Sequence, residues 1–161
     1  MPTSILPADL VTEQLRSYAT RGVFREFSAT PHGAQRIDYR FVWLTPRPVH
    51  AQFDARTNVL KLVELLPGVE PRSAMDKALR EFLSGRFSTK LPPHRRLSKT
   101  LIRELKCVNR GGALSLSLAL NGKQAGEATK QAVNLVSEIF QNFLAGPYHE
   151  YMVVNFDLRE D

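Results

Sequence analysis

Five side chains in this sequence are of the kinds that most often bind metals or attack substrates. They are His32, His50, His94, His149 and Cys107. No two of them stand at the spacing of a metal-binding motif, and a lone cysteine excludes an internal disulfide and a cysteine-rich zinc site. A catalytic thiolate also needs a lowered pKa and a histidine partner. We therefore expect no metal site and no cofactor, and we interpret the cysteine as a small core residue.

Glycine and acidic residues offer no catalytic motif either. The sequence Arg110-Gly111-Gly112 lies between two strand patterns, whereas a phosphate-binding loop joins a strand to a helix with a longer glycine spacing. Asp38 and Asp54 belong to a strand and to the end of the next one, where a solvated carboxylate is the simpler interpretation. Neither a Gly-x-Ser-x-Gly elbow nor a helical pair of histidines is present. The sequence thus predicts a protein without a catalytic site.

The positive charge of the chain is concentrated in residues 86–110. The formal net charge is +6, and this segment holds eight basic residues against Glu104 alone, so the rest of the chain sums to −1. Such a cluster can follow the phosphates of a nucleic acid, but its only aromatic residue is Phe87, and single-strand binders use stacking rings. A solvated face or a contact with an acidic partner is the alternative. The basic residues that we expect at the surface are Arg95, Arg96, Lys99, Arg103, Lys106 and Arg110.

Alternating apolar residues predict the sheet that would carry these side chains. A period of two covers residues 37–43, resumes over 49–55, and is followed after a turn by an almost wholly apolar run at 59–66. Two prolines between the first two runs rule out a central strand there. The three runs predict an antiparallel meander with one strongly apolar face. A shorter β-like run over residues 23–29 precedes it, and we expect residues 30–33 to break that run.

A second β block follows in the basic part of the chain. Alternation returns over residues 101–108 and again over 113–120, and two glycines between them favour the positive φ of a hairpin turn. In the later run leucines face one way, while alanines and serines face the other. These small side chains indicate close approach by another element or by a second subunit. A run over 148–158, rich in β-formers, predicts an edge strand. In the run over residues 101–108, one side of the strand is expected to hold Leu101, Arg103, Leu105 and Cys107.

Three segments have the apolar spacing of amphipathic helices. The first covers residues 8–20 and stops at Gly22, because glycine is favoured just beyond a helix end. The second opens at Glu70-Pro71, since proline is tolerated in a first turn, and closes at Gly85. The third covers about 124–144 and stops before a Gly-Pro pair. The predicted order is therefore helix, strands, helix, hairpin and helix.

The totals fit one domain over residues 1–161. With 43% hydrophobic and 24% charged residues, the chain can bury a core, and we expect an α+β domain: an antiparallel sheet, meander plus hairpin, with three helices packed on it. The beginning of the chain has no basic and apolar regions of a secretory signal, and no apolar run approaches the roughly 20 residues of a membrane span. A cytoplasmic protein is expected, with no membrane partner.

The order of these elements resembles that of type III secretion chaperones and the related bacterial YbjN-like proteins. The resemblance is carried by the first helix ending at Arg21-Gly22, the meander over 37–66, the helix after Pro71, the hairpin over 101–120, and the helix ending at Phe143. It covers most of the chain. It implies a convex-sheet α+β domain, often dimeric, which binds segments of other proteins and has no catalytic site.

The sequence therefore predicts a non-enzymatic protein-interaction or chaperone-like module of bacterial type. We expect a homodimer that binds a protein client through exposed apolar sheet surface. The expected contact residues are Leu114, Leu116, Leu118 and Trp43. Nucleic-acid binding through the basic segment, residues 86–110, is the alternative.

Overall fold

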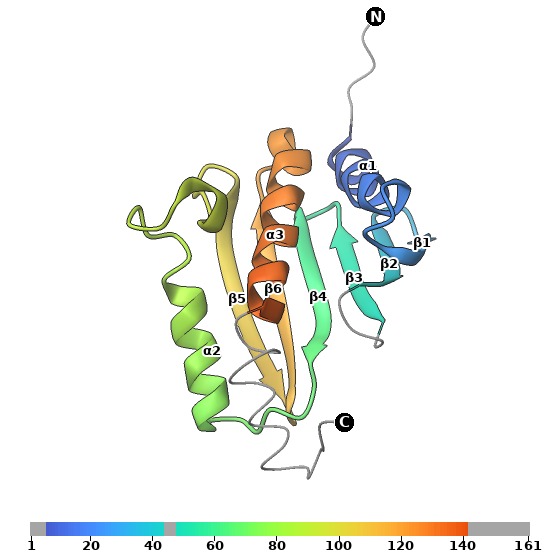
Figure 1. The fold of residues 1–161 in the computed structure, drawn as a ribbon. Helices are drawn as coiled ribbons and strands as arrows, with labels where there is room; N and C mark the ends of the chain where they lie inside the picture. The colour runs from blue at the N-terminus through green and yellow to red at the C-terminus, as the bar shows by residue number, and fades with distance from the viewer. Residues whose placement is uncertain (1–5, 44–47, 142–161) are drawn as a thin grey trace, which may run out of the picture.

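The computed structural model describes residues 6–43 and 48–141, and within them six strands form one antiparallel sheet in the order β1-β2-β3-β4-β6-β5 (Figure 1). With three helices beside the sheet, the predicted α+β class is confirmed. The strands are β1 (Arg25–His32), β2 (Arg36–Val42), β3 (Val49–Asp54), β4 (Val59–Leu66), β5 (Ile102–Arg110) and β6 (Ala113–Leu120). The helices are α1 (Pro7–Thr20), α2 (Ala74–Ser84) and α3 (Ala125–Ile139), with 3₁₀ turns at η1 (Pro93–Arg95) and η2 (Gly122–Gln124).

The predicted meander is confirmed and is one strand longer than expected. β2, β3 and β4 are each antiparallel to the next. β1 precedes them and pairs with β2 as far as His32, so the predicted break at residues 30–33 is wrong for its first three residues. Pro31 can lie in β1 because β1 is at the sheet edge, where a missing N–H need not cost a ladder bond. The turn comes instead at Gly33, with φ of +71°.

The hairpin of β5 and β6 is also confirmed, with Gly111-Gly112 at φ of +59° and +97° in its turn. The predicted facing of β5 is wrong at the start of the strand. A register shift between Ile102 and Glu104 inserts one extra residue, and such a bulge interrupts the alternation of side chains. Ile102 is therefore buried and Arg103 exposed, whereas the later inward positions, beginning with Leu105, are as predicted.

Local capping decides where the first two helices begin and end. α1 stops as predicted before Gly22, which has φ of +78°. α2 begins at Ala74 and not at the predicted proline, because Ser73 is its N-cap and accepts a bond from the Asp76 amide at 3.1 Å. Arg72, with φ of +66°, cannot belong to the helix. A hydroxyl cap that satisfies a free amide thus sets the start, and Gly85 ends the helix as predicted.

The third predicted helix and the predicted edge strand extend beyond the described residues. α3 begins one residue later than predicted and ends at Ile139, followed by two residues in a wider helical turn. The predicted last turn of that helix, residues 142–144, and the edge strand over 148–158 lie outside the described residues. In the described part of the chain, no helix combines the length and apolar character needed to cross a membrane.

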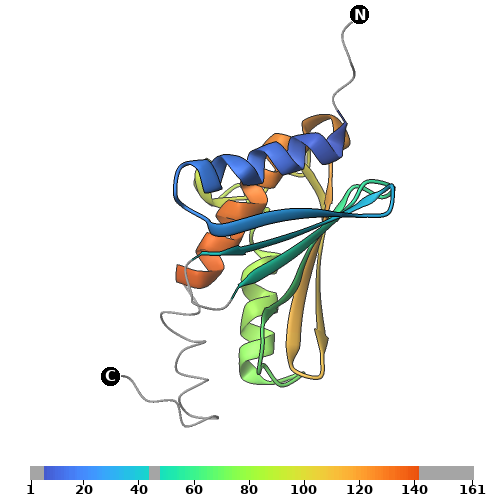
Figure 2. The ribbon, with the colours of Figure 1, turned by 90° about the vertical axis from the view of Figure 1, so that its right-hand side faces the viewer.

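All three helices lie on one face of the sheet (Figures 1 and 2). α3 lies across the middle of the sheet, α1 packs against α3, and α2 runs beside β5 at one edge. The core forms between this helical layer and the strands. Its centre includes the four inward-facing leucines of β6, none of which is more than 1% exposed: Leu114, Leu116, Leu118 and Leu120. Within the described residues, the opposite face of the sheet has no helix on it.

A cluster of aromatic rings joins the meander to two helices. Phe24 stacks on Phe41 with 4.0 Å between ring centroids and contacts Tyr18 of α1 at 5.1 Å. Trp43, just after β2, lies edge-on to Phe24 and Phe140 at 5.2 and 5.7 Å. Aromatic pairs of this kind contribute about 0.5–1.5 kcal/mol each beyond the area they bury. The cluster therefore fixes the end of β2 between α1 and α3.

A buried polar network docks the β5–β6 turn onto the start of α2. Asn109 Nδ2 donates to the Val69 carbonyl at 2.7 Å and to Asp76 Oδ1 at 3.0 Å, and Asn109 Oδ1 accepts from the Gly112 amide. Arg80 Nε donates to Asp76 Oδ2 at 3.1 Å. Burial by itself raises the pKa of Asp76, but the bonds from Asn109 and Arg80 outweigh it and hold that pKa below its usual value. The carboxylate is thus charged at neutral pH, and both of its oxygens accept hydrogen bonds.

Candidate functional site

The residues expected to contact a client lie in the core. Leu114, Leu116 and Leu118 are 1%, 1% and 0% exposed, and Trp43 is half-buried in the aromatic cluster. The expectation of an exposed apolar surface at these positions is therefore corrected. The physical reason is that the helical layer covers the apolar face of the sheet. These leucines therefore pack in the core and stabilise the fold.

The other face of the same strands is open in the described part of the chain. Its central row, which we call the outer sheet face, consists of the small side chains of β6: Ala113, Ser115, Ser117 and Ala119. Lys61 of β4 and Lys106 of β5 lie in register with Ser117 on either side. Val108, opposite Ser115, is 41% exposed. This face has small side chains in the middle and charged ones at its flanks, where Lys106 is paired with Glu104 of the same strand.

Several cations of the basic segment have partners inside the fold. Arg95 donates from Nε and Nη2 to the two carboxylate oxygens of Glu138 at 3.1 and 3.2 Å. Arg86 is buried. The ammonium of Lys99 lies 4.2 Å from the ring centroid of Phe87, an arrangement typical of a cation–π contact. Part of the charge cluster that the sequence shows is therefore structural.

The other predicted surface cations lie nearer to the sheet. Arg96 Nη1 donates to a backbone carbonyl of its own loop at 3.3 Å, and Arg103 Nη2 donates to the last carbonyl of β6 at 3.1 Å. Lys106 forms an ion pair with Glu104 at 3.4 Å. Arg110 is exposed beside the hairpin turn. The structure thus distributes these six residues over a loop and a strand and does not arrange them as one row.

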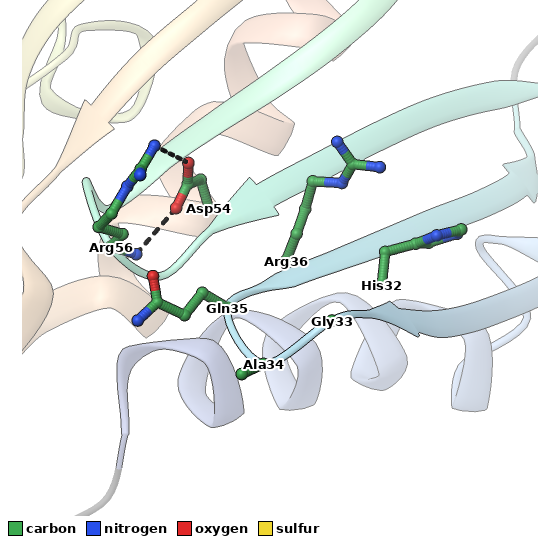
Figure 3. Close-up of a pocket in the computed structure, with 7 residues that line it drawn as sticks. All are labelled: His32, Gly33, Ala34, Gln35, Arg36, Asp54 and Arg56. Atoms are coloured by element: carbon green, nitrogen blue, oxygen red, sulfur yellow. Dashed lines mark hydrogen bonds and ion pairs between the residues drawn. The ribbon is translucent and has the colours of Figure 1, made fainter.

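A polar hollow of about 610 Å³ lies at the β1–β2 and β3–β4 turns (Figure 3). Asp54 accepts from the Arg56 amide at 2.9 Å and lies 3.8 Å from its guanidinium. His32 Nε2 is 2.8 Å from a carboxylate oxygen of Asp38. Figure 3 shows Gln35 and His32 pointing in opposite directions, away from a common centre. Catalysis needs groups that converge on one reacting atom, so this hollow offers no catalytic arrangement.

An apolar groove of about 240 Å³ lies between α2 and β5, and we call it the α2–β5 groove. Arg80, Leu83 and Ser84 share one face of α2 because they are three or four positions apart. Phe87 follows the helix, and alternate positions of β5 supply the other wall. The lining residues are Arg80, Leu83, Ser84, Phe87, Leu105 and Cys107. Arg80 Nη1 also donates to the Cys107 carbonyl at 2.9 Å, which holds the helix against the edge strand.

The thiol in the groove is not set up as a nucleophile. Burial raises the pKa of Cys107 and outweighs the opposite effect of the Arg80 guanidinium, so the thiol is protonated at neutral pH. None of the residues lining the groove is a histidine that could take its proton. Among residues 6–43 and 48–141, no three metal-ligating side chains gather. The arrangement is suited to binding an apolar group.

Sequence reasoning did not predict this groove. It considered Cys107 and Leu105 as strand residues and Phe87 as an isolated ring in the basic segment. Leu83 belongs to the second predicted helix, whose apolar spacing was interpreted only as packing. The available signal was the run of helical spacings that continues from Leu83 to Phe87 after the glycine stop. That α2 lies beside β5, and not across the sheet, could not be read from periodicity.

These features define a small α+β protein with a helical layer on one face of its sheet and a groove at one edge. Comparison with protein-family models, with curated proteins and with solved structures gives no match. The residues of the chain itself therefore carry what can be proposed about its function.

Proposed function

We propose that this protein is a non-enzymatic protein-interaction module that holds a segment of a client protein in the α2–β5 groove. The observation that supports this function is the apolar groove beside an edge strand. Its volume of about 240 Å³ is below the roughly 300–1,000 Å³ of pockets that take small molecules. A groove of this size suits one or two apolar side chains of a bound chain. A chaperone-like role, as the element order implies, is part of this proposal.

Nucleic-acid binding is the weaker alternative. Arg95, Arg96 and Arg103 donate to acceptors within the fold, and Lys106 is in an ion pair. A phosphate backbone would have to compete with these partners before it gained the electrostatic attraction on which such binding depends. The groove is a more specific feature than the charge, because it combines shape with apolar walls.

A peptide library displayed against the full chain tests the proposed function. We expect enriched peptides to carry a large apolar residue and to lose at least about tenfold in affinity, or about 1.4 kcal/mol, when the groove is filled by Ser84→Trp. Ser84 is exposed, so the substitution does not disturb the core. The matched control is Thr20→Trp, which adds the same ring at an exposed residue of α1 outside the groove lining. Peptides that bind the wild type and Ser84→Trp equally, or no enrichment, would contradict the proposal.

We also propose that a second copy of the chain stacks on the outer sheet face. Small side chains allow two sheets to approach closely, and a two-fold interface uses the same patch on both subunits. Ser115 and Ser117 lie in the middle of this patch. The exposed Val108 adds apolar surface beside them. The proposal accounts for a face that has no described helix on it.

The oligomeric state can be measured by size-exclusion chromatography with light scattering. We expect the wild type at twice the chain mass of 18.2 kDa and Ser117→Glu at the chain mass. The longer side chain blocks close stacking, while Lys61 and Lys106 beside it balance its charge in the single chain. Thr20→Glu, at the exposed end of α1, is the control and should leave the mass unchanged. A wild type that elutes at 18.2 kDa at high concentration would remove the proposal.

A further inference from the structure

Three residues of the basic segment line the α2–β5 groove. Phe87, Leu105 and Cys107 line it, and all three belong to residues 86–110, which carry a net charge of +7. One wall of the apolar groove is therefore built from the most basic part of the chain. A bound segment would meet apolar walls and, at the edge of the groove, the guanidinium of Arg80.

The charged groups at the groove are held in place by other contacts. Arg80 lines the groove, and its Nε and Nη1 are fixed by Asp76 and by the Cys107 carbonyl. Among the contacts of the described residues, none engages its Nη2. Lys99 keeps its ammonium 4.2 Å from the centroid of Phe87. Arg80 is thus positioned at the groove, and Lys99 is held on the ring of a groove-lining residue, before any ligand arrives, which reduces the entropy lost on binding.

We propose that the segment held in the groove is acidic. In this proposal, which rests on the proposed function, one apolar side chain of a partner protein inserts between Leu83, Phe87 and Leu105. A flanking Asp or Glu of that partner then pairs with Arg80 or Lys99. Charge complementarity selects an acidic segment because a basic one would place like charges at a partly desolvated site.

Cys107 gives a direct measurement of occupancy because it is the only cysteine in the chain and lines the groove. The experiment follows the rate at which an aromatic disulfide reagent modifies the full chain. Four synthetic peptides of equal length serve as probes. Three have a central leucine flanked by aspartates, by serines or by lysines, and the fourth has aspartates around a central alanine. At about ten times its dissociation constant, a peptide that covers the thiol slows the reaction by a factor of about 11.

We expect the aspartate–leucine peptide to slow modification at concentrations at least about tenfold lower than the serine or lysine peptide, which corresponds to about 1.4 kcal/mol. The alanine peptide should protect weakly, since it lacks the anchor. Lys99→Glu should reduce the preference for aspartate, and raised salt should do the same. Lys123→Glu makes the same change at an exposed residue outside the groove lining and should have no effect.

The outcomes separate this inference from the function on which it rests. Equal protection by the three leucine peptides would overturn the acidic preference and leave the binding module intact. If no peptide protects Cys107, or if protection survives in Ser84→Trp, both proposals fail. Protection that rises with protein concentration alone would identify a second copy of the chain as the occupant, and it would also overturn the inference.

Discussion

Replacing Leu118 by alanine is expected to lower the free energy of unfolding by about 3–5 kcal/mol, the range for a fully buried leucine whose surroundings cannot collapse into the space. Leu118 is 0% exposed and lies between Leu60 of β4 and Leu105 of β5 in register, with the helical layer over it. Strands on both sides and helices above leave little freedom to close a cavity. Urea denaturation followed by circular dichroism measures the change.

The control for this result is the neighbouring position on the opposite face of the strand. Ser117→Ala removes one hydroxyl from a half-buried position and should change the free energy of unfolding by no more than about 0.5 kcal/mol. A small effect of Leu118→Ala, together with weaker client binding, would restore the original expectation that the β6 leucines are contact residues. A large loss of stability with unchanged affinity per folded molecule agrees with a core role.

Most of the fold could be predicted because it follows from local patterns. The period of two over residues 37–43, 49–55 and 113–120 appears as strands with the expected inward faces. Glycines at positive φ end α1 and turn the hairpin. The errors have local causes too. The bulge at Ile102–Glu104 is a shift of one residue in strand register, and the cap at Ser73 depends on one hydrogen bond; periodicity reports neither.

The candidate site was less predictable because it depends on how elements pack. From the sequence, the leucines of β6 could be interpreted as exposed apolar surface. They are buried because all three helices pack on that face of the sheet (Figures 1 and 2). In the same way, Arg95 was an unassigned cation in the sequence, and only the packing of α3 beside its loop places it against Glu138. The α2–β5 groove joins residues more than twenty positions apart, such as Leu83 and Leu105. No short-range spacing encodes that contact.

Replacing Asp76 by alanine is expected to lower the free energy of unfolding by about 2–4 kcal/mol, because a buried carboxylate that accepts several bonds is lost at once. Asp76 is 4% exposed. Without it, Asn109 loses one of its two acceptors, and Arg80 keeps only its bond to the Cys107 carbonyl. The turn of the β5–β6 hairpin would then be held mainly by the backbone of Val69, which lies in the segment before α2. Glu81→Ala, at an exposed acidic residue of the same helix, is the control and should cost about 0.5 kcal/mol or less.

The pH dependence of this stabilisation has a defined sign. The pKa of Asp76 is lowered from 3.8 in the folded chain, so its charged form stabilises the fold above pH 4 and that contribution is lost as the pH falls through the folded pKa. Asp76→Asn keeps the shape and one oxygen but cannot ionise. The difference in unfolding free energy between wild type and Asp76→Asn should therefore be large at pH 7 and become smaller as the pH falls below 3.8 and through the folded pKa of Asp76. Because the other carboxylates titrate in both proteins, a difference that stays constant over this range would show that the charge of Asp76 does not stabilise the junction between α2 and the hairpin.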